Sequence, residues 1–214
     1  MNKILQKYLV LSSVLLVAIL TSMTNAALPP DTVIEQISEQ MIAALKKNHE
    51  VLAKDPNEIF PLIDRILLPH FDVEMIDRMV LGKAWRTAST QQRQQFGNEF
   101  QRFVMNAYAR QLLNYSDERL QVDLLSPVAQ NSHQVTVHGQ IVTGNAEPVS
   151  INYHLHMKNG VWKIYDITVE GVSLVINYRS SFAKEIRKGG LDALIHKLAE
   201  HNRQFRLEGS GNRE

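Results

Sequence analysis

The longest regular pattern in the sequence is an amphipathic stretch from Ser89 to Tyr115. Its apolar residues recur at the i, i+4, i+7 and i+8 spacing that places them on one stripe of a helix, and polar residues fill the opposite face. Ser89 and Gln92 have the spacing of a capping box, in which each side chain bonds the backbone N–H of the other residue. The pattern therefore predicts one long helix that lies along an equally long apolar surface. Its stripe is Phe96, Phe100, Phe103, Val104, Ala107, Tyr108, Leu112 and Tyr115.

Three shorter helices are predicted before this long one. Thr32 with Glu35 has the capping-box spacing at the start of the first. Asp72 is placed to cap the third, and Gly82 is placed to end it. The three are expected at 32–49, 57–67 and 73–81.

The hydrophobic period changes from 3.6 to 2 after the long helix, which indicates strands. Asn159-Gly160, between the last two alternating segments, is a strong hairpin signal. Consecutive antiparallel strands with one apolar face need a layer of helices over that face. We therefore expect an α+β fold in which a four-stranded antiparallel sheet packs against several helices. The strands are expected at 120–124, 135–141, 149–157 and 161–169, and two further helices at 173–187 and 190–202.

The first 26 residues have the composition of a secretory signal peptide. Lys3 and Lys7 precede an apolar run that is too short to span a bilayer, and Ala26 is a small residue at the expected cleavage point. The remaining residues are enough for one domain, expected at 27–205, with a disordered Gly/Ser-containing tail at 206–214. Because the exported chain contains no cysteine, we expect it in a bacterial periplasm.

The charge balance argues against nucleic acid as a partner. The chain has 23 basic and 22 acidic residues, and without Lys3 and Lys7 the acidic residues exceed the basic ones by one. A nucleic-acid-binding domain usually carries a strong basic excess.

The most specific motif is the run GVSLVINYRSSF at 171–182, which is followed by GLDAL at 190–194. Three segments precede it in the chain: PHFD at 69–72, LGKAWR at 81–86 and YARQLL at 108–113. In this order the segments resemble the MlaC, or toluene-tolerance, family of periplasmic phospholipid-binding proteins. The resemblance extends over nearly all of the chain that follows the signal peptide.

This resemblance implies a fold and a function. The fold would be an NTF2-like cone with an apolar cavity between sheet and helices, and the cavity would hold phospholipid as cargo, with no cofactor and no enzymatic activity. The chain would act as a monomeric shuttle between an outer-membrane lipoprotein complex and an inner-membrane ABC transporter with MCE domains. Such transport maintains the lipid asymmetry of the outer membrane.

The physical demand on such a carrier is large. Two acyl chains carry roughly 30 methylenes, so exposing them to water costs on the order of 24 kcal/mol. The protein must therefore enclose the tails, and flexible methionines suit such a lining. For each candidate residue, plain core packing is the competing explanation. The candidate lipid-binding residues are Phe71, Met75, Met79, Phe96, Phe100, Phe103, Val104, Tyr108, Leu112, Ile151, Tyr153, Leu155, Ile164, Val169, Val172, Val175 and Arg179.

Arg179 is the one charged residue in this set. It lies in an apolar stretch, where it would either contact a lipid phosphate or form a structural salt bridge.

Three histidines offer a possible metal site. His154 and His156 share one strand face, and His138 falls on the neighbouring strand, so their imidazoles are a possible donor set for zinc. A polar outer face of the sheet is the simpler explanation, and no metal is predicted.

Two constellations raise the question of catalysis. His70 beside Asp72 has the composition of an acid–base pair, but Asp72 is explained more simply as a helix cap. Gly171 to Val175 begins like a nucleophile elbow but lacks its second glycine.

Two other functions stay open beside the carrier. An NTF2-like enzyme acting on a hydrophobic small molecule needs a buried acid–base residue with a displaced pKa inside the cavity. A protein-interaction module would instead have a solid core and no bound lipid.

Overall fold

The computed structural model describes residues 27–114, 121–124, 133–142 and 147–211. The expected signal peptide lies outside these residues. Within the described part of the chain, no helix combines the length and the apolar character needed to cross a membrane.

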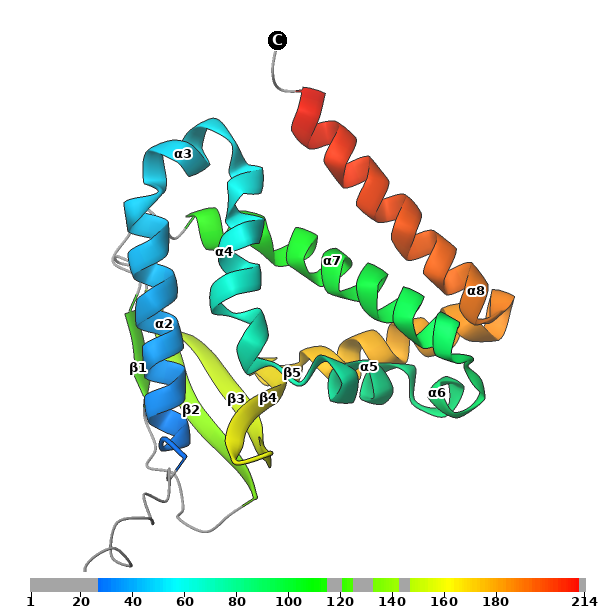
Figure 1. Ribbon diagram of the computed structural model, residues 1–214, viewed down its shortest axis with the longest axis horizontal. Coiled ribbons are helices and arrows are strands. Elements are labelled where there is room, and N and C mark those ends of the chain that lie inside the picture. Colours follow the sequence, from blue (N-terminus) through cyan, green and yellow to red (C-terminus); the bar gives the residue numbers. More distant parts are fainter. Residues whose placement is uncertain (1–26, 115–120, 125–132, 143–146, 212–214) are drawn as a thin grey trace, which may run out of the picture.

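The described chain forms helices, then an antiparallel sheet, then a long C-terminal helix (Figure 1). This is the α+β order that the sequence predicts. The elements are α2 (Pro30–Lys47), α3 (His49–Lys54), the 3-10 helix η1 (Pro56–Glu58), α4 (Ile59–Ile66), the 3-10 helix η2 (Leu68–His70), α5 (Val73–Leu81), α6 (Lys83–Thr87), α7 (Thr90–Asn114), β1 (Gln121–Leu124), β2 (Gln134–Val142), β3 (Val149–Lys158), β4 (Val161–Val169), β5 (Val172–Ser173) and α8 (Leu174–Gly211).

The sheet is a meander in which each strand pairs antiparallel with the next, in the order β1-β2-β3-β4-β5. The four predicted strands are confirmed. Asn159 and Gly160, with φ of 52° and 79°, form the predicted tight turn between β3 and β4. The two-residue strand β5 was missed because it is too short to show any alternation.

Helix α8 consists of two helical segments that meet at Gly190, where φ is 80° and ψ is 177°. The second segment folds back alongside α7 (Figure 1). This break lies at the boundary between the two C-terminal helices that the sequence predicts. The backbone of α8 continues as a helix to Gly211, past Phe205, where the domain was expected to end.

The start of α7 confirms the predicted capping box. The Ser89 N–H donates to Gln92 Oε1 at 3.0 Å, and the Gln92 N–H donates to Ser89 Oγ at 3.1 Å. The start predicted for α2 is wrong: this helix begins at Pro30 and has no side-chain cap. A proline suits the first helical position because its φ is already helical and its missing N–H would have no partner there.

We expect Ser89→Ala to lower the free energy of unfolding by about 1 kcal/mol, because it removes the side-chain acceptor of this exposed cap. Ser89→Asp keeps an acceptor and should stay close to wild type. Urea unfolding of the three proteins measures the difference. Equal midpoints for Ser89→Ala and wild type would show that the cap contributes nothing.

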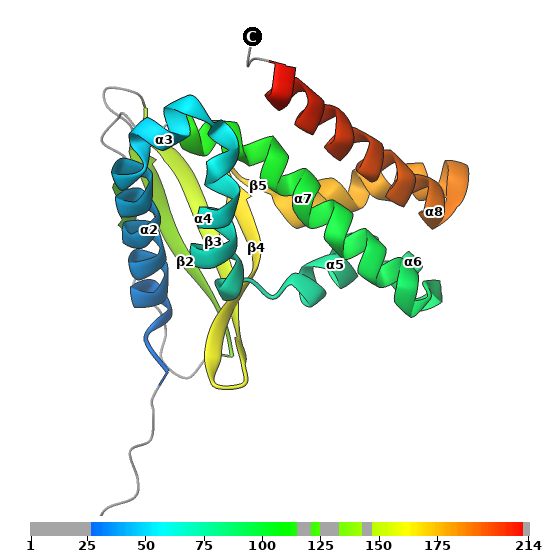
Figure 2. The same cartoon turned by 45° about the horizontal axis from the view of Figure 1, so that its top comes forward.

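The buried apolar residues form three separate clusters. One joins α2, α3 and α4 to Ala109 of α7, a second joins α5, α7 and α8, and a third joins the first half of α2 to the sheet. Both views show α2 lying along the sheet and the helices from α5 to α8 gathered to one side (Figures 1 and 2). A domain of this size usually has one contiguous core, so the division indicates a space at the junction of the clusters.

Candidate functional site

A cavity of about 680 Å³ lies where the three clusters meet. Met41 and Ile63 line it from the first cluster, Phe100 from the second, and Ile34 and Ile164 from the third. Its wall is almost entirely aliphatic and aromatic, which is the character of sites that take apolar ligands.

Ten of the seventeen candidate lipid-binding residues line this cavity. As lipid contacts they stay a prediction. They come from η2–α5, α7, three strands and the start of α8, so the long helix and the sheet face each other across the space. The ten are Phe71, Phe100, Val104, Tyr108, Ile151, Tyr153, Ile164, Val169, Val172 and Val175.

Six candidates lie elsewhere, and the side chain of Leu112 is outside the described residues. Phe96 and Phe103 pack edge-on against Phe182 in the aromatic cluster between α7 and α8. Leu155 is completely buried in the cluster under α2. Met75, Met79 and Arg179 are likewise not among the residues that line the cavity.

Arg179 is exposed and lies against the backbone of Gly82, where an added Cβ would sit 3.1 Å from its Nε. It forms no ion pair within the described part of the chain, so the expected salt bridge is not found there.

Sequence reasoning missed most of the wall that α2, α4 and α5 provide. The pattern of α2 could not identify them, because residues that pack and residues that face empty space follow the same helical period. The missed residues on or directly after these three helices are Ile34, Ile37, Ser38, Met41, Ile42, Ile63, Leu67, Leu68, Val73, Ile76 and Asp77.

The cavity reaches the surface where β5 meets α8. Val172 lines the cavity and is nevertheless 54% exposed, and Ile176, one turn further on, is 63% exposed. Two exposed apolar side chains therefore lie at this opening or beside it.

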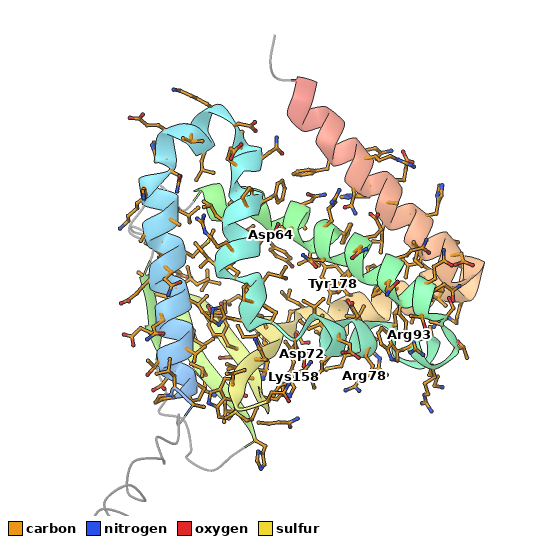
Figure 3. The ribbon with its side chains drawn as sticks, in the orientation of Figure 1. Asp64, Asp72, Arg78, Arg93, Lys158 and Tyr178 are labelled. Atoms are coloured by element: carbon orange, nitrogen blue, oxygen red, sulfur yellow. The ribbon has the colours of Figure 1, made fainter. Side chains whose placement is uncertain are left out.

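Two tyrosines supply polar groups within the apolar wall. Burial raises the pKa of Tyr153 to about 12, against the opposing effect of a hydrogen bond with Ser38. Burial also raises the pKa of Tyr178, and its hydrogen bond with Tyr108 acts in the same direction. Figure 3 places Tyr178 among the side chains between α7 and α8. Both phenols therefore stay neutral at physiological pH.

Asp166 is an acidic residue of the wall whose two carboxyl oxygens both accept hydrogen bonds. It accepts the Ile167 N–H at 2.8 Å, the Val175 N–H at 3.1 Å and the Ser173 hydroxyl. These bonds hold the end of β4 to the start of α8.

Asp77 is a different kind of carboxyl group. It is 6% exposed and pairs with no described residue. No fully buried side-chain oxygen of the described residues lacks a partner, so the carboxyl oxygens of Asp77 still reach solvent. Burial, and then the negative charge of Glu74, raise the pKa of Asp77 to about 7. Its side chain lies against Gly97 of α7, where an added Cβ would be 2.5 Å from Asp77 Oδ2.

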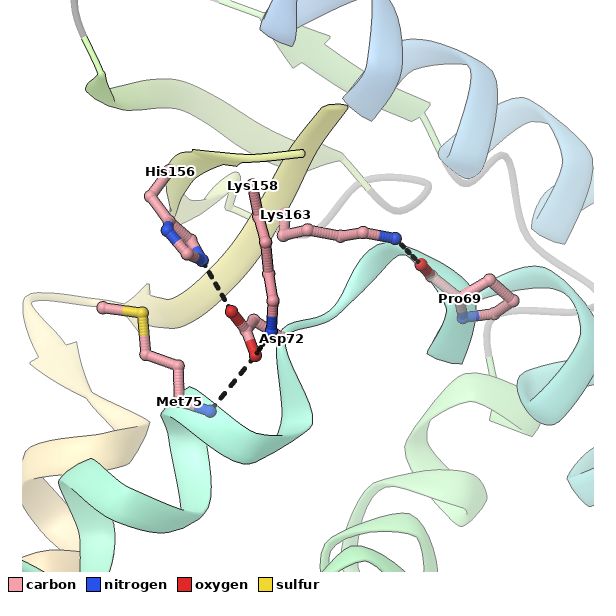
Figure 4. A network of polar contacts seen from close by, with 6 residues as sticks. All are labelled: Pro69, Asp72, Met75, His156, Lys158 and Lys163. Atoms are coloured by element: carbon pink, nitrogen blue, oxygen red, sulfur yellow. Dashed lines mark hydrogen bonds and ion pairs between the residues drawn. The ribbon is translucent and has the colours of Figure 1, made fainter. Parts of the chain in front are cut away.

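Asp72 holds the first turn of α5 to the sheet (Figure 4). Its Oδ1 accepts the Met75 N–H at 3.2 Å and pairs with Lys158 Nζ at 2.8 Å, and its Oδ2 lies 2.9 Å from His156 Nε2. Burial opposes ionisation, but Lys158, the Met75 N–H and His156 together lower the pKa of Asp72 below its usual value. These contacts fix the wall that carries Val73, Ile76 and Asp77.

The histidines of the outer sheet face pair with their neighbours. His154 lies between Thr136 Oγ1 at 3.1 Å and Thr168 Oγ1 at 2.8 Å, and His138 Nδ1 is 2.8 Å from Asn152 Oδ1. Across the described residues, no three His, Cys, Asp or Glu side chains are grouped so that they could hold a metal ion. Burial, and then the positive charge of Lys163, lower the pKa of His70. The Asp72 carboxylate accepts a hydrogen bond from Lys158.

The fold and the cavity define a protein that encloses an apolar ligand between a sheet and a set of helices. Residues 35–200 match the family described as MlaC protein. The chain belongs to the MlaC family, as the segments at 69–86 and 171–194 suggested.

Individual relatives agree with this assignment. The chain is 26% identical over 196 residues to the intermembrane phospholipid transport system binding protein MlaC of Haemophilus influenzae, covering 90% of this chain and 91% of the relative. It is 30% identical over 179 residues to the toluene tolerance protein ttg2D of Pseudomonas putida, covering 83% and 82%.

A solved structure shares the fold. The phospholipid-binding protein of Ralstonia solanacearum, determined in complex with a phospholipid, matches with a TM-score of 0.75 and 24% identity. The match covers 84% of this chain and 99% of that one.

Proposed function

We propose that this protein is a phospholipid carrier that holds acyl chains in the cavity between the sheet and α2, α4, α5, α7 and α8. The observation that carries the proposal is the apolar cavity itself, in a chain of the MlaC family. The names of its relatives support phospholipid as the ligand.

The cavity has room for about two thirds of the methylenes of this cargo. If a methylene takes about the volume of a liquid water molecule, ~30 Å³, then 680 Å³ accommodates roughly 20 methylenes. At about 0.8 kcal/mol for each methylene, enclosing them contributes on the order of 16 kcal/mol, comparable with the benefit of leaving the same chains in a bilayer. Such a carrier can exchange lipid with membrane-bound partners, because the cavity and the bilayer hold the acyl chains with similar free energies.

The pathway that we propose is a shuttle in the periplasm between an outer-membrane lipoprotein complex and an inner-membrane ABC transporter with MCE domains. The predicted signal peptide supports export, and the name of the Haemophilus influenzae relative supports an intermembrane role. The exposed Val172 and Ile176 at the rim of the cavity suit a site where lipid passes to such a partner.

The experiment that tests the carrier function is mass spectrometry of the mature protein purified from periplasm without detergent. We expect phospholipid near one molecule per protein, released by organic extraction. The purified protein should also take fluorescent phospholipid from vesicles. A protein that carries no lipid and takes none from vesicles would contradict the proposal.

A cavity enzyme is the second candidate because of Asp77. This residue provides a buried carboxyl with a pKa near 7, which a general base needs. Incubation with phospholipid followed by mass spectrometry separates the two functions. Lysophospholipid that accumulates with wild type but not with Asp77→Asn would favour the enzyme, whereas unchanged lipid favours the carrier.

A further inference from the structure

The most exposed part of the cavity wall lies at the start of α8. Of all the residues that line the cavity, only Val172 and Asn177 are exposed, and the others are buried or half-buried. Val172 belongs to β5 and Asn177 to the first turn of α8. A phospholipid keeps its headgroup in water, so its polar end would lie here. Its ester groups, which join the acyl chains to the glycerol, would then lie just inside this opening.

Two tyrosines bring hydroxyl groups to the wall beside the opening. Tyr178 follows Asn177 directly on α8 and lines the cavity, and Tyr108 lines it from α7. The ring of Tyr178 packs edge-on against Phe100 and Phe103, with centroid distances of 5.2 and 5.9 Å, and lies between α7 and α8 (Figure 3). The side chains of Tyr178 and Tyr108 are hydrogen-bonded to each other.

The hydrogen bond between these two phenols has a direction. It raises the pKa of Tyr178, as expected when Tyr178 is the donor, because ionisation of a donor removes the proton that makes the bond. Tyr178 therefore donates and the Tyr108 oxygen accepts. A phenol is both a donor and an acceptor, so the Tyr108 hydroxyl group keeps its own proton and can donate it to an acceptor that enters the cavity.

The part of a phospholipid that enters an apolar cavity carries few acceptors. The alkyl chains have none, and the ester carbonyl oxygens are the polar atoms nearest to them. Taking a carbonyl group out of water costs free energy unless it finds a hydrogen-bond donor. A tyrosine suits this boundary because its ring packs against apolar chains while its hydroxyl group bonds to a polar atom.

We propose that the pair of Tyr108 and Tyr178 recognises the ester linkage of the cargo. The Tyr108 hydroxyl group donates to an ester carbonyl oxygen, and Tyr178 is a positioning residue that fixes the orientation of this hydroxyl group. The contact is the same for every diacyl phospholipid, whatever its headgroup. This inference rests on the proposed carrier function and adds a preference for ester-linked over ether-linked chains.

The test is competitive uptake from vesicles that contain equal amounts of two phosphatidylethanolamines with the same chain length, one diacyl and one dialkyl. The ether linkages of the dialkyl lipid lack the carbonyl oxygens. Lipid recovered with the delipidated protein is quantified by mass spectrometry. We expect Tyr108→Phe to lower the ratio of diacyl to dialkyl lipid about fivefold relative to wild type, which is the factor that one neutral hydrogen bond typically contributes. Comparing proteins on the same vesicles cancels any difference between the two lipids in the bilayer.

Two further variants define the contact. Tyr178→Phe removes the bond that orients the Tyr108 hydroxyl group, so it should lower the same ratio by a smaller factor. Tyr165→Phe is the matched control, because Tyr165 is on β4 but does not line the cavity, and it should keep the wild-type ratio. Both substitutions in the cavity keep the aromatic ring, and circular dichroism checks that each protein is folded.

A wild-type ratio in Tyr108→Phe would overturn the ester contact and leave the carrier function standing, because the carbonyl groups would then be hydrated or bonded elsewhere. An equal fall in Tyr165→Phe would overturn it as well, since the effect would not come from the cavity. No uptake of either lipid by wild type would overturn both proposals. If Tyr108→Phe does not fold, Tyr178→Phe decides: a wild-type ratio in this variant would overturn the role of the pair.

Discussion

Ile151→Trp should reduce lipid uptake by about fiftyfold while leaving the protein folded. Ile151 is on β3, is 7% exposed and lines the cavity, but it is not part of any of the three packed clusters. A larger side chain at this position therefore extends into space that the cargo would occupy. If the indole displaces only three methylenes, the loss at about 0.8 kcal/mol each is ~2.4 kcal/mol, which corresponds to about a fiftyfold change in affinity.

Val104→Trp tests the same idea from the opposite wall. Val104 lies on α7 and also lines the cavity, so its replacement should reduce uptake by a similar factor. Val161→Trp is the matched control, because Val161 is on β4 but is 49% exposed. Uptake of fluorescent phospholipid from vesicles measures all three, with circular dichroism as the check on folding.

The cavity assignment would be contradicted if both inward-facing variants were folded and took up lipid as wild type does. Loss of uptake with Val161→Trp as well would point to a general effect of adding an exposed tryptophan to the sheet.

Local patterns predicted the elements of this fold well. The capping box at Ser89 and the turn at Asn159-Gly160 depend on residues adjacent in sequence, so their signals are complete within a few positions. The start of α2 was predicted two residues too late, because the pattern at Thr32 competes with Pro30, which already favours a helical start. The local patterns were therefore sufficient for most strands and for the long helix.

The cavity residues could be predicted only in part, and two phenylalanines show why. Phe96 and Phe100 lie one turn apart on the same stripe of α7, and their rings stack at 5.3 Å. Phe96 is completely buried between α7 and α8, whereas Phe100 also borders the cavity. Nothing in their spacing separates them, because the difference is whether another element fills the space in front of the ring.

Asp77 could not be identified from sequence for a related reason. On α5 it reads as an ordinary polar position between Ile76 and Arg78. Its burial depends on Gly97, twenty residues later on α7, where the missing side chain lets the two helices approach around the carboxyl group. The hydrophobic periodicity of one helix carries no information about which residue of another helix packs against it.

We expect Asp77→Asn to raise the free energy of unfolding of the lipid-free protein by roughly 2 kcal/mol at pH 8. In the folded protein the pKa of Asp77 is about 7, against a usual value of 3.8. The folded state therefore binds this proton more strongly than the unfolded state does, and the stability it contributes is complete below about pH 4 and is lost as the pH rises to 7. A difference of about three pKa units corresponds to ~4 kcal/mol. Burying the asparagine amide in place of the carboxyl group costs about 1–3 kcal/mol, so roughly 2 kcal/mol of stabilisation remains.

Urea unfolding of delipidated wild type and Asp77→Asn at pH 5, 6, 7 and 8 measures this effect, with Glu39→Gln as the exposed control. Wild type should lose stability relative to Asp77→Asn across this range, and the two curves should run parallel above pH 7. Glu74 and Arg93 are the charged groups that line a small pocket together with Asp77. Because the charge of Glu74 raises the pKa of Asp77, Glu74→Gln should reduce the total loss of stability without removing it. A constant difference between wild type and Asp77→Asn at all four pH values would show that Asp77 is already ionised with a partner in the folded protein.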